Sequence, residues 1–140
     1  MTLVFAQEQG LEVDEFVAVV GDSDLGLSRP LADAGRIAAM LRGANLIVTA
    51  RLDGLCVGVA RCITDFAWVC YCSELAVRRG FQGRGIGTGL LETCKTIVGD
   101  GVSLALLSAP GAVSYYEHAG PRIGLQRAAD AFYLPRSRGA

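Results

Sequence analysis

The chain has 140 residues, of which 51% are hydrophobic and 19% charged, and its formal net charge is −1. This composition is too apolar for a disordered chain, and the near-zero charge predicts no general affinity for nucleic acid. The longest apolar run, Phe66–Cys72, is far shorter than the roughly 20 residues of a membrane-spanning helix. No secretory signal is predicted, so we expect one cytoplasmic domain that spans residues 1–140 and has no membrane partner.

The chain is predicted to alternate between sheet and helix, because its hydrophobic period changes repeatedly. In chain order the predicted elements are a strand at 2–5, helices at 11–20 and 30–43, strands at 45–52, 56–63 and 68–77, a helix at 85–98, a strand at 103–107, a helix at 111–119, and strands at 122–125 and 131–134. Turn signals separate the three central strands and predict an antiparallel meander. The order β-αα-βββ-α-β-α-ββ is that of an α+β domain with a mixed sheet and helices on both faces.

The cysteines form an odd set outside any secretory context, which favours reduced thiols in an intracellular protein. They are Cys56, Cys62, Cys70, Cys72 and Cys94. A zinc site needs about four ligands, and His118 is the single histidine. Buried free thiols are therefore favoured over a metal site.

The most informative stretch runs from Leu75 to Leu91, where a strand leads into a glycine-rich turn that opens directly into an apolar helix. Glycines let successive backbone N–H groups converge, and a helix N-terminus adds partial positive charge, so the turn is suited to a pyrophosphate. A P-loop is disfavoured because the only lysine is Lys95, and a dinucleotide fingerprint is disfavoured because Thr88 stands at its third glycine. A turn that only packs is the less favoured alternative.

Two motifs carry a resemblance to a known family. Gln82-Gly83-Arg84-Gly85-Ile86-Gly87 resembles the Q/R-x-x-G-x-G/A signature of the GNAT superfamily of N-acetyltransferases. The segment Ala112–Gly120 is similar to the A-x-x-F-Y-x-x-x-G helix of the same superfamily, and the predicted element order matches its acyl-CoA acyltransferase fold. The chain thus resembles a small single-domain bacterial GNAT enzyme.

The resemblance implies that acetyl-CoA is the cosubstrate and that no metal takes part. It assigns the cofactor to the strand end and the turn, with the turn on the pyrophosphate and the main chain of the strand end along the pantetheine arm. The residues so assigned are Leu75, Ala76, Val77, Gln82, Gly83, Arg84, Gly85, Ile86, Gly87 and Thr88. Tyr116 would donate a proton to the departing CoA thiolate, and a packing role is its alternative.

An amine acceptor must lose a proton before it attacks, which costs on the order of 4–5 kcal/mol at pH 7 for an alkylamine. Glu74 is the first candidate for the general base, with a solvated or salt-bridged carboxylate as an equal alternative, and Glu117 and His118 are weaker candidates. Cys70 and Cys72 have no histidine partner in the pattern, so packed thiols are favoured over a covalent acyl-enzyme.

Every charged side chain before Arg29 is acidic. These side chains belong to Glu8, Glu12, Asp14, Glu15, Asp22 and Asp24. In GNAT proteins the first two helices border the acceptor site, so this charge favours a small cationic primary amine. The alternatives are a protein lysine or N-terminal amine, and a non-catalytic acyl-CoA-binding module. A homodimer is compatible with the sequence.

Three positions depart from the family pattern. Ala109 stands where many members have an asparagine that contacts the cofactor, and Pro121 replaces the usual aromatic residue. Arg79 occupies a common proline position, where it either adds attraction for a phosphate or is simply solvated.

Overall fold

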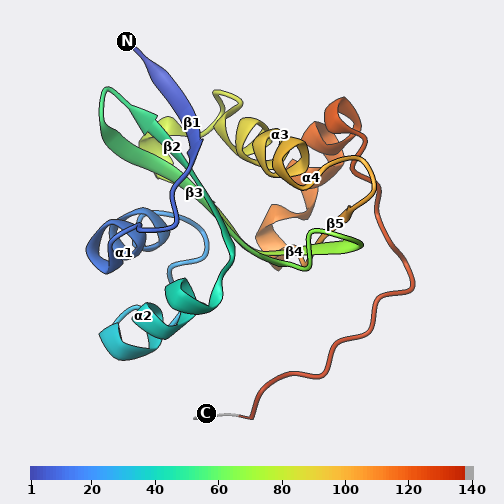
Figure 1. Ribbon diagram of the computed structural model, residues 1–140, viewed down its shortest axis with the longest axis horizontal. Helices are drawn as coiled ribbons and strands as arrows, with labels where there is room; N and C mark the ends of the chain where they lie inside the picture. The colour runs from blue at the N-terminus through green and yellow to red at the C-terminus, as the bar shows by residue number, and fades with distance from the viewer. Residues whose placement is uncertain (138–140) are drawn as a thin grey trace.

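The computed structural model describes residues 1–137, whose five strands form one sheet in the order β1-β2-β3-β4-β5 (Figure 1). The helices and strands are β1 (Leu3–Gln7), α1 (Val13–Gly21), α2 (Ala34–Gly43), β2 (Leu46–Leu52), β3 (Leu55–Thr64), β4 (Val69–Val77), α3 (Ile86–Val98), β5 (Ser103–Leu106) and α4 (Val113–Ala119). Strands β1 to β4 pair antiparallel and β5 pairs parallel to β4, which confirms the predicted mixed sheet and its central meander. None of the described helices is long and apolar enough to cross a membrane.

Helices cover both faces of the sheet, as Figure 1 shows. On one face the apolar side of α3, including Leu90 and Cys94, packs against the sheet. On the other face α1 and α2 contribute Phe16 and Ile37, which are completely buried. Burial of each such side chain stabilises the fold by about 1.5–3 kcal/mol relative to exposure. These two apolar layers hold β4 between them.

A β-bulge interrupts β4 in its middle. Arg61 of β3 pairs with Glu74, whereas the next residue, Cys62, pairs with Cys72, so Ser73 is the extra residue. The bulge changes which side chains face which layer. Cys72 packs in the layer of α3, whereas Glu74 turns to the layer of α1 and α2, where Arg61 also lies.

Strand β4 also separates from its neighbour β5. The parallel pairing covers only Val69 to Cys72, so residues 73–77 of β4 have no partner on that side. A strand edge of this kind presents unpaired backbone donors and acceptors. The two strands therefore part at the bulge, and the edge of β4 from Ser73 onward is open.

The second helix differs from its prediction at its start. It begins at Ala34 rather than near Pro30, because the Asp33 side chain accepts a hydrogen bond from the backbone N–H of Arg36 at 3.0 Å. This is the usual N-cap arrangement. Residues 22–33 form an irregular loop, called here the α1–α2 loop, which runs from the end of α1 to this cap.

The two strands expected at 122–125 and 131–134 are absent, and both expectations are wrong. Residues Gly120–Ile123 form a 3₁₀ turn that begins with Gly-Pro, and proline cannot donate to a sheet ladder. Gly124 follows with a φ of +78°, and the Leu125 N–H closes the turn on the Gly120 carbonyl at 2.9 Å. Residues 131–134 are extended and irregular, with Phe132 and Leu134 each 95% exposed.

Candidate active site

A cleft of about 500 Å³ follows the free edge of β4, and we call it the β4 cleft. Its wall is formed by the end of β4, the glycine-rich turn, α4 and the α1–α2 loop. The predicted site residues that line it are Leu75, Ala76, Val77, Gln82, Gly83, Gly85, Ile86, Gly87, Thr88 and Tyr116. Arg84 and Glu74 are not part of its lining. The fold thus brings together most of the residues singled out in the sequence.

A larger hollow, of about 660 Å³, lies between α3, β5 and the 3₁₀ turn Gly120–Ile123. None of the predicted site residues lines it. Its lysine, Lys95, donates hydrogen bonds to the carbonyls of Gly99 at 2.9 Å and Val102 at 2.6 Å. That ammonium group serves to close the end of α3, so the size of this hollow does not make it the better candidate.

The glycine-rich turn leaves backbone N–H groups without helical partners at the wall of the β4 cleft. Gly83 and Gly85 have φ values of +79° and +78°, which side chains with a Cβ rarely adopt. Gly85 is also the N-cap of α3, so the N–H groups of the first helical turn have no partner inside the helix. At Gly87 the constraint is different, because a Cβ there would meet the hydroxyl of Tyr115 and the Tyr115 ring would have to shift.

The side chains of the turn are tied to their surroundings. Gln82 Nε2 donates to the Val77 carbonyl at 2.9 Å and so closes the end of β4. The guanidinium carbon of Arg84 lies 5.2 Å from the centre of the Phe81 ring, in a cation–π contact. The backbone N–H of Arg79 donates to the Asp22 carbonyl at 2.9 Å, which fixes the α1–α2 loop to the turn.

Two adjacent tyrosines project from α4, with ring centres 5.1 Å apart and planes at 74°. Burial raises the pKa of Tyr116 above its ordinary value of 10, and the nearby Cys72 and Tyr115 add to the effect. Tyr116 is therefore fully protonated at neutral pH. A protonated phenol in the wall of a cleft can donate a hydrogen bond or a proton to a bound group.

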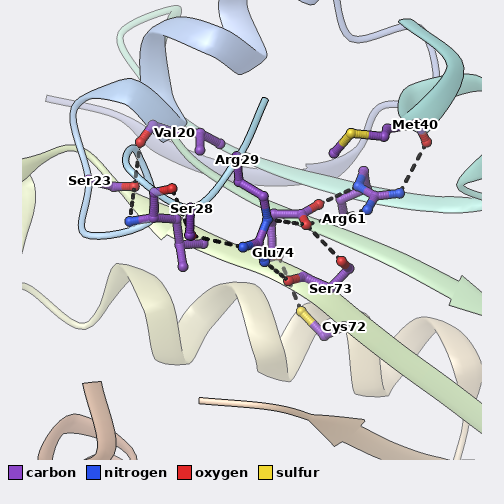
Figure 2. Close-up of polar contacts among 10 residues, drawn as sticks. Val20, Ser23, Ser28, Arg29, Met40, Arg61, Cys72, Ser73 and Glu74 are labelled. Carbon is purple, nitrogen blue, oxygen red and sulfur yellow. Dashed lines mark hydrogen bonds and ion pairs between the residues drawn. The ribbon is translucent and has the colours of Figure 1, made fainter. Parts of the chain in front are cut away.

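Glu74 lies beneath the β4 cleft, with its side chain only 1% exposed (Figure 2). Arg61 donates to both carboxylate oxygens, through Nε to Oε1 and through Nη2 to Oε2 at 3.3 Å. Arg29 Nε and Ser73 Oγ also donate to Oε2, at 2.8 and 2.7 Å. Burial alone would raise the pKa of Glu74, but these hydrogen bonds and the charge of Arg61 hold that pKa below its usual value.

These contacts bear on the predicted role of Glu74 as general base. Its carboxylate is held as an anion by four donors, and the bulge turns it away from the layer of α3. Of the weaker candidates, His118 lines the cleft, whereas Glu117 is exposed and accepts a hydrogen bond from Arg127 at 3.0 Å. The base assignment stays a prediction, and the contacts of Glu74 favour its ion-paired alternative.

All five cysteines are buried free thiols. Hydrogen bonding with Cys62 and burial raise the pKa of Cys72, and its Sγ donates to the Glu74 carbonyl at 3.3 Å. A thiol in that state is a poor nucleophile. Within residues 1–137 no group of histidine, cysteine and carboxylate side chains could hold a metal ion.

Most of the acidic N-terminal side chains do not face the cleft. Glu8 and Glu15 form ion pairs with Arg51 at 3.0 and 2.7 Å. Of the six acidic residues only Asp24 lines the β4 cleft, where it lies 3.6 Å from Arg79. The sequence pattern missed Arg29, which lines the cleft. The one feature of the sequence that distinguishes Arg29 is that it is the first basic residue, after six acidic ones.

Comparisons with known proteins agree with this geometry. The family model of the GNAT acetyltransferase domain matches residues 43–120. No curated relative matches the chain. Among solved structures, a protein of Deinococcus radiodurans R1 named for an inferred acetyltransferase activity is 24% identical, with a TM-score of 0.71 over 96% of this chain and 88% of that one.

Two aminoglycoside acetyltransferases share the same fold. One, solved in complex with CoA, is 15% identical, with a TM-score of 0.71 over 98% of this chain and 95% of its own. The other, from an uncultured soil sample and solved with sisomicin, is 14% identical, with a TM-score of 0.71 over 96% and 97% of the two chains. The family match spans more than half of the sequence and includes both motifs. The chain belongs to the GNAT acetyltransferase family.

Proposed function

We propose that this GNAT acetyltransferase moves the acetyl group of acetyl-CoA directly to a small primary amine. The observation that carries the proposal is the free edge of β4 beside the glycine-rich turn, inside one cleft. An extended pantetheine arm can add to such an edge by backbone hydrogen bonds. The donor-rich turn at the end of the edge suits a pyrophosphate.

The proposed orientation of acetyl-CoA follows from these two features. The pyrophosphate lies on the turn from Gln82 to Thr88, and the pantetheine arm runs along β4 from Val77 toward the bulge at Ser73. Four residues of strand span about 13 Å. The thioester then lies near the bulge, where the wall of the cleft is made by β4, α4 and the α1–α2 loop.

Tyr116 is the proposed general acid. The amine nitrogen attacks the thioester carbonyl carbon, the C–N bond forms, and the C–S bond breaks as the CoA thiolate leaves. The Tyr116 phenol donates its proton to that thiolate, and the amine loses its proton to a base or to water. The raised pKa of Tyr116 keeps this proton in place at neutral pH, but it also makes the phenol a weaker acid than a thiol, so donation depends on the position of the phenol beside the sulfur. The tyrosinate then regains a proton from water.

The proposed acceptor is a small amine, which is cationic in solution before it loses its proton. Support comes from two structural neighbours named as aminoglycoside acetyltransferases, one of them in complex with sisomicin. Asp24 supplies one acidic group in the cleft wall. A protein lysine or N-terminal amine is the alternative acceptor, and an acyl-CoA-binding module without turnover is the alternative function.

Thermal unfolding with added ligands tests the cofactor. A ligand at a hundred times its Kd stabilises a protein by about 2.7 kcal/mol. We expect acetyl-CoA and CoA to raise the Tm, and ATP and NAD to leave it unchanged. Incubation with acetyl-CoA and a panel of amines, read by mass spectrometry, then tests turnover. Stabilisation by CoA with no acetylated product from small amines, peptides or the protein itself would favour the binding module.

A further inference from the structure

We propose that Arg29 is an acceptor-binding residue, and that the amine acceptor carries a carboxylate group which the Arg29 guanidinium binds. This inference rests on the proposed function and deepens it, because it names the chemical class of the acceptor as a zwitterionic amine. Arg29 lines the β4 cleft and comes from the α1–α2 loop.

The hydrogen bonds of Arg29 leave part of its guanidinium available. Nε donates to Glu74 Oε2 at 2.8 Å, Nη2 to the Ser73 carbonyl at 2.8 Å, and Nη1 to Ser28 Oγ at 3.0 Å (Figure 2). A guanidinium has five N–H groups. Two of them have no partner within residues 1–137, and the side chain is 22% exposed at the cleft wall.

The charges around Arg29 do not cancel. Arg29 and Arg61 are two cations that share the single anion Glu74, which leaves one net positive charge. The fork of Arg61 already satisfies both oxygens of Glu74. Of the two cations, Arg29 is the one that lines the cleft, and its side chain is more exposed than that of Arg61, so a carboxylate from solution can approach it.

Three of the acidic side chains of the N-terminal segment pair with arginines other than Arg29. Glu8 and Glu15 bind Arg51, and Asp24 faces Arg79. Glu74 is the carboxylate that contacts Arg29 among the described residues. Within residues 1–137 no other carboxylate forms an ion pair with Arg29, so its two remaining N–H groups can take a carboxylate from a ligand.

The guanidinium is also held in place before any ligand binds. Ser23 Oγ donates to the Val20 carbonyl at 2.7 Å and accepts from the Leu25 N–H at 3.2 Å, which orders the start of the loop (Figure 2). The Arg79–Asp22 backbone bond ties the same part of the loop to the turn. A preorganised donor loses little entropy when it binds a ligand.

The position of Arg29 separates it from the cofactor phosphates. Arg29 bonds to Ser73 at the bulge, whereas the pyrophosphate turn follows the far end of β4 beyond Val77. The two points are about 13 Å apart along the strand. The cation therefore lies beside the proposed position of the thioester, where an acceptor must enter, and not beside the phosphates.

A comparison of paired substrates tests the inference. The probes are β-alanine against β-alaninamide and 4-aminobutanoate against 4-aminobutanamide, each pair with the same amine and with or without the carboxylate. We expect kcat/KM to favour the carboxylates by roughly 10- to 100-fold, the range of one charge-assisted hydrogen-bonded contact. Arg29→Gln should remove this preference, so that the ratio of kcat/KM for each carboxylate to kcat/KM for its amide falls to about one.

Two further variants separate recognition from structure. Arg29→Lys keeps the charge but loses the planar fork, so it should retain part of the preference. Ser28→Ala removes one partner of Arg29 and should retain most of it. An equal fall of kcat/KM for both members of each pair in Arg29→Gln, with preserved stabilisation by CoA, would assign Arg29 a structural role and overturn the inference.

A binding measurement keeps the two proposals distinguishable. In the presence of saturating CoA, β-alanine and 4-aminobutanoate should raise the Tm of the wild-type protein, and their amides should not. Equal shifts, or none, contradict the carboxylate site even where turnover is undetected. If acetyl-CoA itself fails to stabilise the protein, the proposed function fails. If both members of each pair are acetylated at equal rates, the proposed function stands and only the inference of a carboxylate-binding site fails.

Discussion

The two ends of the β4 cleft are built from different chemical groups. At the turn end, the wall comes from one short segment of the chain, residues 82–88 without Arg84, and three of its six lining residues are glycines. At the bulge end, it rests on side chains that are distant in sequence, with Arg29 bonded to Glu74 across 45 positions. The turn end thus depends on local backbone conformation, and the bulge end depends on long-range ion pairing.

This difference predicts how each end responds to change. Backbone donors are present whatever the side chains are, so the turn end fails only when its conformation is strained. The bulge end is an ion cluster in which removal of one member leaves a buried charge without its partner. Substitutions at the bulge end should therefore cost more than those at the turn end, and the substitutions below test that order.

The largest expected effect concerns Tyr116, which lines the β4 cleft from α4. Tyr116→Phe removes the proposed proton donor, and general acid catalysis contributes roughly 10²- to 10⁴-fold. We expect kcat to fall by that factor, with the stabilisation by CoA retained. Tyr133→Phe, on the exposed C-terminal segment, is the matched control and should turn over normally. A Tyr116→Phe enzyme with unchanged kcat would return this residue to a packing role.

Removal of the buried carboxylate should have the largest effect on stability. Glu74→Gln leaves Arg29 and Arg61 close together without an anion, and breaking a buried ion pair costs about 3–5 kcal/mol. The free energy of unfolding in urea measures this loss. Glu117→Gln is the control, because its pair with Arg127 is exposed and such pairs contribute about 0–1 kcal/mol. Equal losses in the two variants would show that Glu74 is not critical for the bulge end.

The sequence predicted the sheet and the turn because their signals are local. Runs rich in β-branched and aromatic residues and the turn signals between them predict the meander, which the pairing of β2, β3 and β4 confirms. The strands expected at 122–125 and 131–134 rested on short apolar runs alone. The Gly-Pro start of the 3₁₀ turn and the positive φ of Gly124 decide against the first of these runs.

The bulge end could not be predicted in the same way. Glu74 was identified, but its direction depends on the extra residue at Ser73, which only the pairing of β4 with β3 reveals. Its partners Arg29 and Arg61 stand in other elements, and no spacing rule connects them. The acidic N-terminal stretch likewise did not predict the charge of the cleft, because Glu8 and Glu15 form ion pairs with Arg51 instead of facing the cleft.

A smaller effect is expected from acid. The pKa of Glu74 is lower in the folded chain than in the unfolded chain, so the unfolded chain binds a proton more readily. This contribution to stability is complete above the unfolded pKa, about 4.3, and is lost as the pH falls through the folded value. The stability difference between the wild type and Glu74→Gln should therefore shrink below about pH 4.3. Urea unfolding at a series of pH values measures it, and a constant difference would contradict the linkage.

The smallest effect is expected at the turn end, from a single methyl group. Gly85→Ala forces a residue with a Cβ into the left-handed region, at a φ of +78°, which costs about 1–2 kcal/mol. Gly80→Ala is the matched control, because Gly80 has ordinary φ and open space around its Cα, so its stability should change by less than about 1 kcal/mol. The stabilisation by CoA should also decrease in Gly85→Ala, since a change of this φ would displace the N–H groups proposed to bind the pyrophosphate. If Gly85→Ala lost stability but bound CoA as tightly as the wild type, the backbone donors would not be the cofactor site, and the contrast between the two ends of the cleft would fail at the turn.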